Sequence, residues 1–195
     1  MIRVAHIMQP GEILKIPPHS GSIPLWVYNT SAFLEAPWEI WAYDAGGGLL
    51  KWREENNSSL WCRHAPRLLT SLVRRVYKRK SPRAFFNPDP LRQDPHLSAY
   101  IFSLLPRLVK ENFAIVHLHN YFVFAPIVKR CFRKAKIVLH AHCEWISQAP
   151  SSYVKKALKS IDLVVGCSHH VIRRACEKHP EISERCRVLP NGCFP

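Results

Sequence analysis

The sequence has no hydrophobic run long enough to cross a membrane and no recognisable secretion signal. Its longest apolar stretch, residues 121–128, is much shorter than the roughly 20 residues that a spanning helix needs, and the apolar start at residues 1–8 ends before Pro10. Hydrophobic residues make up 47% of the 195 residues, which is ordinary for a globular protein. The chain is therefore expected to form a single soluble domain, cytoplasmic or at most peripheral on the inner face of a membrane.

Closely spaced cysteine pairs are also absent. The number of cysteines, seven, is odd, and no two of them form a CxxC pair. They are Cys62, Cys131, Cys143, Cys167, Cys176, Cys186 and Cys193. This pattern predicts reduced, buried thiols in a cytosolic protein rather than the disulfide framework of a secreted one.

Acidic residues are few: 14 Asp and Glu stand against 28 Lys and Arg, which gives a net charge of +14. The excess is concentrated in residues 63–92, where Asp89 is the only acid. Residues 63–80 are predicted to form a basic helix, and residues 82–95 an extended, proline-rich connector. We expect the basic segment to dock on an anionic membrane surface, with a solvated helix face as the alternative. Nucleic acid is not an expected partner, because no nucleic-acid-binding motif accompanies the charge.

Short apolar segments alternate with amphipathic helical patterns. The predicted strands are residues 2–8, 39–43, 114–119, 136–142, 161–167 and 187–189. Several are apolar almost throughout, which is typical of parallel strands covered on both faces. Helices are predicted at residues 96–112, where Pro106 should kink or end the helix, and at residues 169–178, with Ser168 as N-cap. The alternation predicts a single doubly wound, Rossmann-like α/β domain over residues 1–195, with ligands beyond the carboxyl ends of a parallel sheet.

A glycine turn follows the first predicted strand. In Ser20-Gly21-Ser22, the glycine would let backbone N–H groups approach a phosphate at the start of the next helix. The signal is weak by itself, because the sequence has neither the GxGxxG fingerprint nor the lysine of a Walker motif.

Two other predicted strands end in histidines. His117 and His119 end one, and His140 and His142 end the next, so the two side chains of each pair point to the same side of their strand. Zinc sites use such ligands, and adjacent parallel strands would bring the four imidazoles together. A metal site is therefore an alternative interpretation, although no further carboxylate or cysteine spacing supports it.

Taken in order, these segments resemble the amino-terminal domain of family 4 glycosyltransferases, retaining enzymes with two facing Rossmann-like domains (the GT-B fold). Residues 21–34 are similar to the family's glycine loop and first helix, residues 114–119 (AIVHLH) to its strand ending in HxH, and residues 138–142 (VLHAH) to its VxTxHD strand. Residues 161–168 (IDLVVGCS) are similar to ADxVxxxS, and residues 188–192 (VLPNG) to the VIPNG motif that closes the first domain.

The resemblance implies a transferase that moves a sugar from a nucleotide-diphosphate donor to a hydroxyl of a glycan or lipid-linked acceptor. The nucleotide sugar would be a co-substrate, and no metal or other cofactor is implied. His142 is implied to contact the acceptor or the transferred sugar near the reaction centre. The other residues implied to bind acceptor or donor phosphate are Gly21, Ser22, His119, Asn120, Cys143 and Glu144. His117 and His140 lie deeper in their strands and are expected to be structural.

Three positions depart from the family pattern: Ser22 stands at the second loop glycine, Ala114 at an aspartate, and Cys143 at the acidic residue after the histidine. The family's donor-binding domain would begin where the sequence stops, after a linker that starts near residue 190. The chain thus corresponds to the acceptor-side domain and is expected to be inactive alone. The alternative is a non-catalytic binding module, or one subunit of a split transferase recruited to a membrane.

Overall fold

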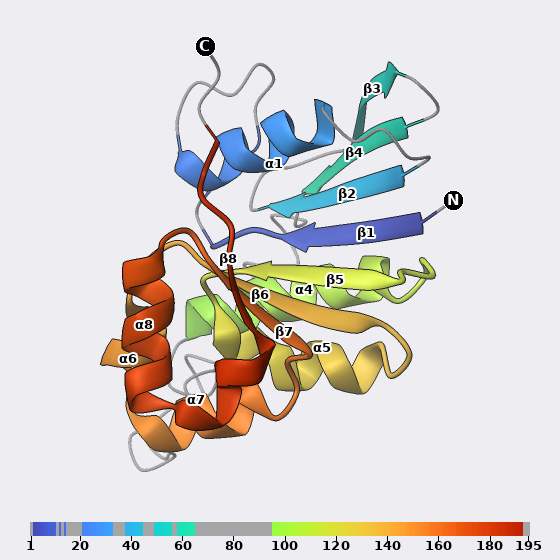
Figure 1. Cartoon of the computed structure of the whole chain (residues 1–195). Coiled ribbons are helices and arrows are strands. Elements are labelled where there is room, and N and C mark those ends of the chain that lie inside the picture. Colours follow the sequence, from blue (N-terminus) through green and yellow to red (C-terminus); the bar gives the residue numbers. More distant parts are fainter. Residues whose placement is uncertain are drawn as a thin grey trace.

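The computed structural model describes residues 2–10, 12, 14, 21–32, 38–44, 49–55, 58–64 and 95–192. Their strands form one eight-stranded sheet in the order β3-β4-β2-β1-β5-β6-β7-β8. Figure 1 shows β3, β4, β2, β1 and β5 in this order from the top of the view. The strands are β1 (Ile2–Ile7), β2 (Trp38–Asp44), β3 (Leu49–Glu55), β4 (Ser58–His64), β5 (Ile115–His119), β6 (Lys136–Ala141), β7 (Leu163–Gly166) and β8 (Cys186–Val188).

The six predicted strands are all present, with ends within two residues of the predicted ones. Neighbouring strands from β4 to β8 pair in parallel, which confirms the predicted Rossmann-like α/β class. At one edge of the sheet, β3 adds an antiparallel strand that pairs with β4. Neither β3 nor β4 was predicted. Both carry charged and polar residues, so they lack the continuous apolar runs of the central strands.

The helices lie mainly between parallel strands. They are α1 (Ser22–Ala32), α4 (Pro95–Leu108), α5 (Ala125–Cys131), α6 (Trp145–Gln148), α7 (Ser151–Leu158) and α8 (His169–Lys178), with 3₁₀ turns at Phe122–Phe124 and Pro180–Arg185. Helix α8 has the predicted bounds, and its N-cap is confirmed because the Ser168 hydroxyl accepts a hydrogen bond from the Val171 N–H at 3.2 Å. Helix α4 ends two residues after Pro106, so the predicted extension to residue 112 was too long.

The predicted basic helix over residues 63–80 is wrong at its start, because Arg63 and His64 belong to β4. The remainder of that helix, and the predicted connector up to residue 94, lie outside the described residues. No helix among the described residues is long and apolar enough to span a membrane.

The two faces of the central strands have different chemistry. Ile7, Leu118 and Leu139 belong to the main hydrophobic core, together with Tyr100 and Leu104 of α4. Because side chains alternate along a strand, the neighbouring positions point to the opposite face, and these are occupied by histidines. Helix α1 covers that second face with a smaller apolar cluster built on Ile23, Trp26 and Val27. The sheet is thus covered on both sides, and one side carries buried polar rings.

Close packing at the end of β7 gives a stability prediction. A Cβ on Gly166 would lie 2.6 Å from Cγ1 and 2.8 Å from Cδ1 of Ile172, on the helix that follows. We expect Gly166→Ala to lower the free energy of unfolding by about 1–3 kcal/mol through overpacking. Urea denaturation measures the change. Gly192→Ala is the matched control, because a Cβ there meets nothing within 4 Å. Equal stability of the two variants would contradict the packing described at Gly166.

Candidate active site

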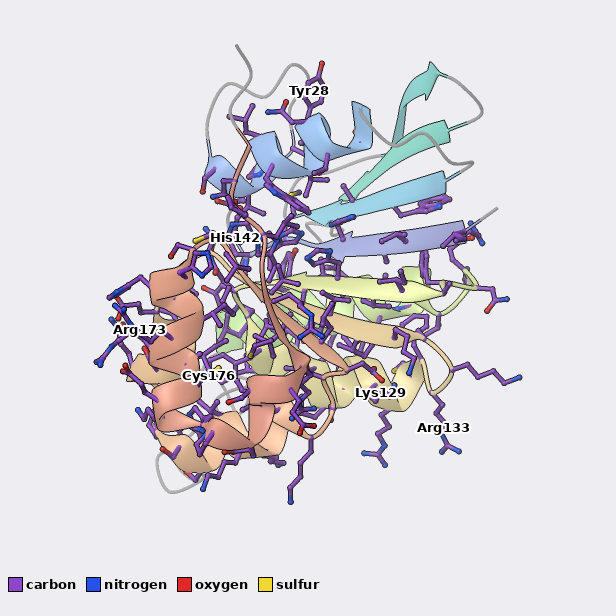
Figure 2. The ribbon with its side chains drawn as sticks, in the orientation of Figure 1. Tyr28, Lys129, Arg133, His142, Arg173 and Cys176 are labelled. Atoms are coloured by element: carbon purple, nitrogen blue, oxygen red, sulfur yellow. The ribbon has the colours of Figure 1, made fainter. Side chains whose placement is uncertain are left out.

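Five histidines meet at the carboxyl ends of β1, β5 and β6, which are neighbours in the sheet. We call them the imidazole cluster: His6, His117, His119, His140 and His142. His6 pairs in register with His117, and His119 with His140. The rings stack closely, with centroids 4.7 Å apart for His117 and His119 and 3.9 Å apart for His140 and His142. Figure 2 shows His142 between α1 and α8.

Trp26 of α1 lies across the whole cluster. Its ring centroid is 4.8 Å from that of His140, in an edge-on arrangement, and within 6.3 Å of the other four imidazoles. The indole is 9% exposed. It therefore separates the imidazoles from solvent on the side of α1, and it fixes the position of that helix over the ends of the strands.

Two hydrogen bonds join three of the rings. His6 Nδ1 lies 3.0 Å from His119 Nε2, and His119 Nδ1 lies 3.0 Å from His142 Nε2. His119, which is fully buried, therefore uses both of its nitrogens within the cluster. The sequence placed His119 in the candidate site, and the structure brings it into direct contact with His142.

Burial keeps the cluster uncharged at neutral pH. It lowers the pKa of His6 to about 3, that of His140 to about 3 and that of His142 to about 4. The pKa values of His117 and His119 are also well below the ordinary value, first because of burial and then because neighbouring imidazoles would repel a second positive charge. Neutral imidazoles each carry one N–H and one lone pair, so each ring can donate one hydrogen bond and accept another.

Several cluster nitrogens are buried and have no hydrogen-bond partner among the residues that the structure describes. They are Nε2 of His117, both ring nitrogens of His140, and Nδ1 of His142. Buried polar atoms are rarely left unsatisfied in native proteins, and those that are often belong to functional sites. The expectation that His117 and His140 are structural fits their burial, while their free nitrogens mark them as parts of the same polar site.

Asn120 ties the ends of three strands together. Its backbone is left-handed, with φ of 60°, a conformation that Asn tolerates better than most residues. The side-chain oxygen accepts a hydrogen bond of 2.7 Å from the backbone N–H of His142, and the amide nitrogen donates to Gln9 Oε1 at 3.1 Å. Asn120 thus holds the backbone of His142 in place.

Cys143 and Glu144 follow His142 but face different neighbours. The Cys143 thiol lies 3.6 Å from Asn120 Oδ1, and burial raises its pKa, so it is a protonated thiol at neutral pH. The Glu144 carboxylate turns to α8, where it lies 3.2 Å from His170 Nε2 and 3.8 Å from Arg174 Nε. The structure therefore groups Cys143 with Asn120, whereas Glu144 contacts the side chains of His170 and Arg174 on α8.

Gly21 and Ser22 lie at the start of α1, as predicted. Gly21 has φ of 90°, which favours glycine, and Ser22 is the first residue of the helix. A Cβ on Gly21 would lie 3.4 Å from Glu12 Oε1. Burial raises the pKa of Glu12 to about 6, partly offset by a hydrogen bond from Gln9. The sequence analysis missed this acidic group, and a diphosphate at Gly21 would have to approach it.

Two overlapping trios of imidazoles are close enough to hold a metal ion: His6, His117 and His119, and His119, His140 and His142. In each trio the ligand atoms lie within 4.8 Å of one another. Neither trio includes a carboxylate or a thiolate among the described residues, so a divalent cation would be buried without an opposite charge. The close nitrogen pairs are also in hydrogen-bonding positions, and we therefore treat the cluster as a hydrogen-bonded network.

A cavity of about 390 Å³ lies at the opposite edge of the sheet. It is lined by residues 109–113 and 130–135, which precede β5 and β6. Ligands of open parallel α/β sheets bind beyond the carboxyl ends of the strands. The imidazole cluster is at that edge, and it is therefore the candidate active site.

The fold is a Rossmann-like domain of the GT-B type, with a polar, buried site where the order of the parallel strands reverses at β1 and β5. The family model for Glycosyltransferase Family 4 matches residues 53–193. The chain therefore belongs to glycosyltransferase family 4, as the motif resemblance predicted. No curated protein sequence matches it.

Solved GT-B structures share the fold at low sequence identity. An α,α-trehalose-phosphate synthase (UDP-forming) from Burkholderia xenovorans, in complex with glucose-6-phosphate, is 17% identical, with a TM-score of 0.59. The corresponding synthase from Burkholderia vietnamiensis is 12% identical, with a TM-score of 0.55. Each match covers nearly all of this chain, 100% and 99%, but only 51% and 48% of the other. This chain spans about half the length of the structures that it matches.

Proposed function

We propose that this chain is the acceptor-side domain of a glycosyltransferase that transfers a sugar from a nucleotide-diphosphate donor to a hydroxyl acceptor. The observation that carries the proposal is the imidazole cluster at the carboxyl edge of a family 4 domain. Donor binding would fall to a second, facing domain. Two of the similar structures hold ligands of these two kinds: an E. coli structure is bound with UDP-2-fluoro glucose, and the B. xenovorans synthase with glucose-6-phosphate.

The proposed reaction breaks the bond between the anomeric carbon of the sugar and the diphosphate. It forms a bond from that carbon to the acceptor oxygen, and the hydroxyl proton leaves with the nucleoside diphosphate. Positive charge develops on the sugar ring in the transition state. His142 suits this position because a pKa of about 4 keeps its imidazole neutral. A neutral ring can hydrogen-bond a sugar oxygen without repelling that positive charge.

Neighbouring residues would position His142 and the acceptor. Asn120 fixes the backbone of His142, and His119 holds its Nε2, so Nδ1 is the ring nitrogen that has no partner among the described residues. Gly21 and Ser22 are proposed to approach the donor phosphate, with Cys143 and Glu144 beside the acceptor. A glycan or a lipid-linked sugar is the proposed acceptor class. Docking of residues 63–92 on an anionic membrane would give access to a lipid-linked one.

A split transferase, in which this chain is one subunit and the donor domain another, is the second candidate. Both candidates assign the same role to the imidazole cluster, and they differ only in how the donor domain is joined to it.

Division of the two substrates between domains predicts weak donor binding by this chain. In calorimetric titrations with common nucleotide sugars, we expect dissociation constants no tighter than millimolar, which corresponds to about −4 kcal/mol. The reason is that the cationic groups that hold the diphosphate are proposed to lie on the facing domain. Micromolar or tighter binding to the 195-residue chain would overturn this assignment, since the donor site would then be complete within it.

A further inference from the structure

The hydrogen-bonded chain His6–His119–His142 links the tautomers of its three rings. Each link joins two ring nitrogens 3.0 Å apart, so one nitrogen of each pair must carry a proton and the other must not. Because all three rings are neutral, each has one proton to place. Both links are made only when the proton is on Nε2 in all three rings, or on Nδ1 in all three. Any mixed arrangement sets two N–H groups or two lone pairs against each other.

The ends of the chain favour one of these two arrangements. At one end, Nδ1 of His142 is buried without a partner, and a proton there would be an unsatisfied donor. At the other end, Nε2 of His6 is not among the buried nitrogens that lack a partner. Buried N–H groups without an acceptor are rarer in proteins than acceptors without a donor. The arrangement with protons on Nε2 avoids the unsatisfied donor.

We propose that His6 and His119 are positioning residues that hold the proton of His142 on Nε2, so that its Nδ1, which has no partner among the described residues, can accept a hydrogen bond from a hydroxyl group. The proposal rests on the proposed function only for the identity of that hydroxyl as part of a sugar. It adds a role for His6, a residue that makes no hydrogen bond to His142 and does not contact the ligand. It also sets the chemistry of the contact: a hydroxyl donates to Nδ1, whereas an unprotonated phosphate oxygen finds no donor there.

The surrounding contacts support this role. The backbone of His142 is fixed by the 2.7 Å hydrogen bond to Asn120, so the ring has a defined direction. His140 stacks on His142 at 3.9 Å but uses neither of its nitrogens in a hydrogen bond, and it therefore stands outside the chain. When the protons of all three rings move from Nε2 to Nδ1, His142 takes up one proton on Nδ1 and His6 releases one from Nε2. The net charge of the cluster stays the same.

Long-range ¹H–¹⁵N NMR spectra of the ¹⁵N-labelled chain at pH 8 identify the protonated nitrogen of each histidine, which coordinates alone do not show. We expect Nε2–H in His6, His119 and His142. Different tautomers within this trio, or a common Nδ1–H tautomer, would overturn the proposal. The measurement needs no sugar, so it tests the proposal whether or not the protein takes part in glycosyl transfer.

Two variants distinguish the effect of the hydrogen-bonded chain His6–His119–His142 from that of ring packing alone. His6→Phe removes the acceptor of the His119 proton, and we expect a substantial Nδ1–H population to appear in His142, two rings away. His140→Phe keeps an aromatic ring on His142 but lies outside the chain, and we expect it to leave His142 as Nε2–H. An unchanged His142 in folded His6→Phe, or an equal change in both variants, would contradict the proposal. If His6→Phe does not fold, the spectrum of the unmodified chain decides alone.

Discussion

The protein is expected to unfold in mildly acidic solution, between about pH 6.5 and pH 5. An unfolded histidine has a pKa near 6.5, whereas burial lowers the pKa of every ring in the imidazole cluster. Below pH 6.5 the unfolded chain therefore binds protons that the folded chain does not. Stability contributed by the neutral rings is complete above that pH and is lost as the pH falls toward the folded-state values of about 3 to 4.

The size of this effect follows from the number of rings. Each proton bound only by the unfolded state costs about 1.4 kcal/mol of stability per pH unit. Five such rings give a slope of about 7 kcal/mol per pH unit, against a total stability of about 5–15 kcal/mol for a typical domain. His179, whose pKa burial also lowers, adds to the slope. Glu12 has a raised pKa and acts in the opposite direction, but it is a single group.

Circular dichroism and denaturant unfolding from pH 8 to pH 4 measure the effect. The slope of unfolding free energy against pH should correspond to uptake of several protons, and His140→Phe should reduce it by about one. Leu189→Ala is the control, because it changes an exposed side chain that does not titrate and should leave the slope unchanged. A native spectrum retained at pH 4 would show that the cluster is not the neutral, buried site described above.

Replacing His142 should have the largest effect on turnover. In a preparation that contains this domain together with its donor-binding domain, we expect His142→Ala to lower kcat by about 100-fold, the effect of removing one well-placed hydrogen-bonding group from a transition state. The ring is only partly buried, so the fold should persist. Steady-state kinetics and a thermal melt on the same samples separate the two effects.

His117→Ala is the comparison variant. Its ring is 9% exposed and stacks between His6 and His119, at centroid distances of 4.8 Å and 4.7 Å. Removing it leaves a cavity, which should cost about 2–3 kcal/mol of stability. The melting temperature should therefore fall more for His117→Ala than for His142→Ala, while kcat falls more for His142→Ala. Near-normal turnover in His142→Ala would remove His142 from the proposed catalytic site.

The central strands could be predicted from the sequence because their signals are local. Residues 114–119 and 136–142 are apolar, β-branched runs, and Ser168 directly precedes an amphipathic pattern, so β5, β6 and α8 appeared close to the predicted places. The edge hairpin β3–β4 was missed because its pattern is mixed and charged. Its two strands are separated by Asn56-Asn57, a spacing typical of a hairpin, which was the one signal available.

The site could be predicted only in part. Polar residues that follow buried strands pointed to His119, Asn120 and His142, because the carboxyl ends of parallel strands meet at one edge. His6 was missed because a single histidine inside the first strand has no signal by itself. Its role depends on a hydrogen bond to His119, on a strand more than 100 residues away in sequence, and the register that pairs His6 with His117 brings the two rings together. Trp26 and Glu12 were missed for the same reason.

Sugar transfer itself tests the central claim most directly. A mixture of nucleotide sugars and candidate hydroxyl acceptors is incubated with this domain, with a donor-binding domain, and with the two together, and products are identified by mass spectrometry. The proposed division of labour predicts a glycosylated product and free nucleoside diphosphate only when both domains are present, and loss of that product with His142→Ala. Transfer by the donor-binding domain alone, undiminished by the absence of this chain, would contradict the assignment of the acceptor side to this domain.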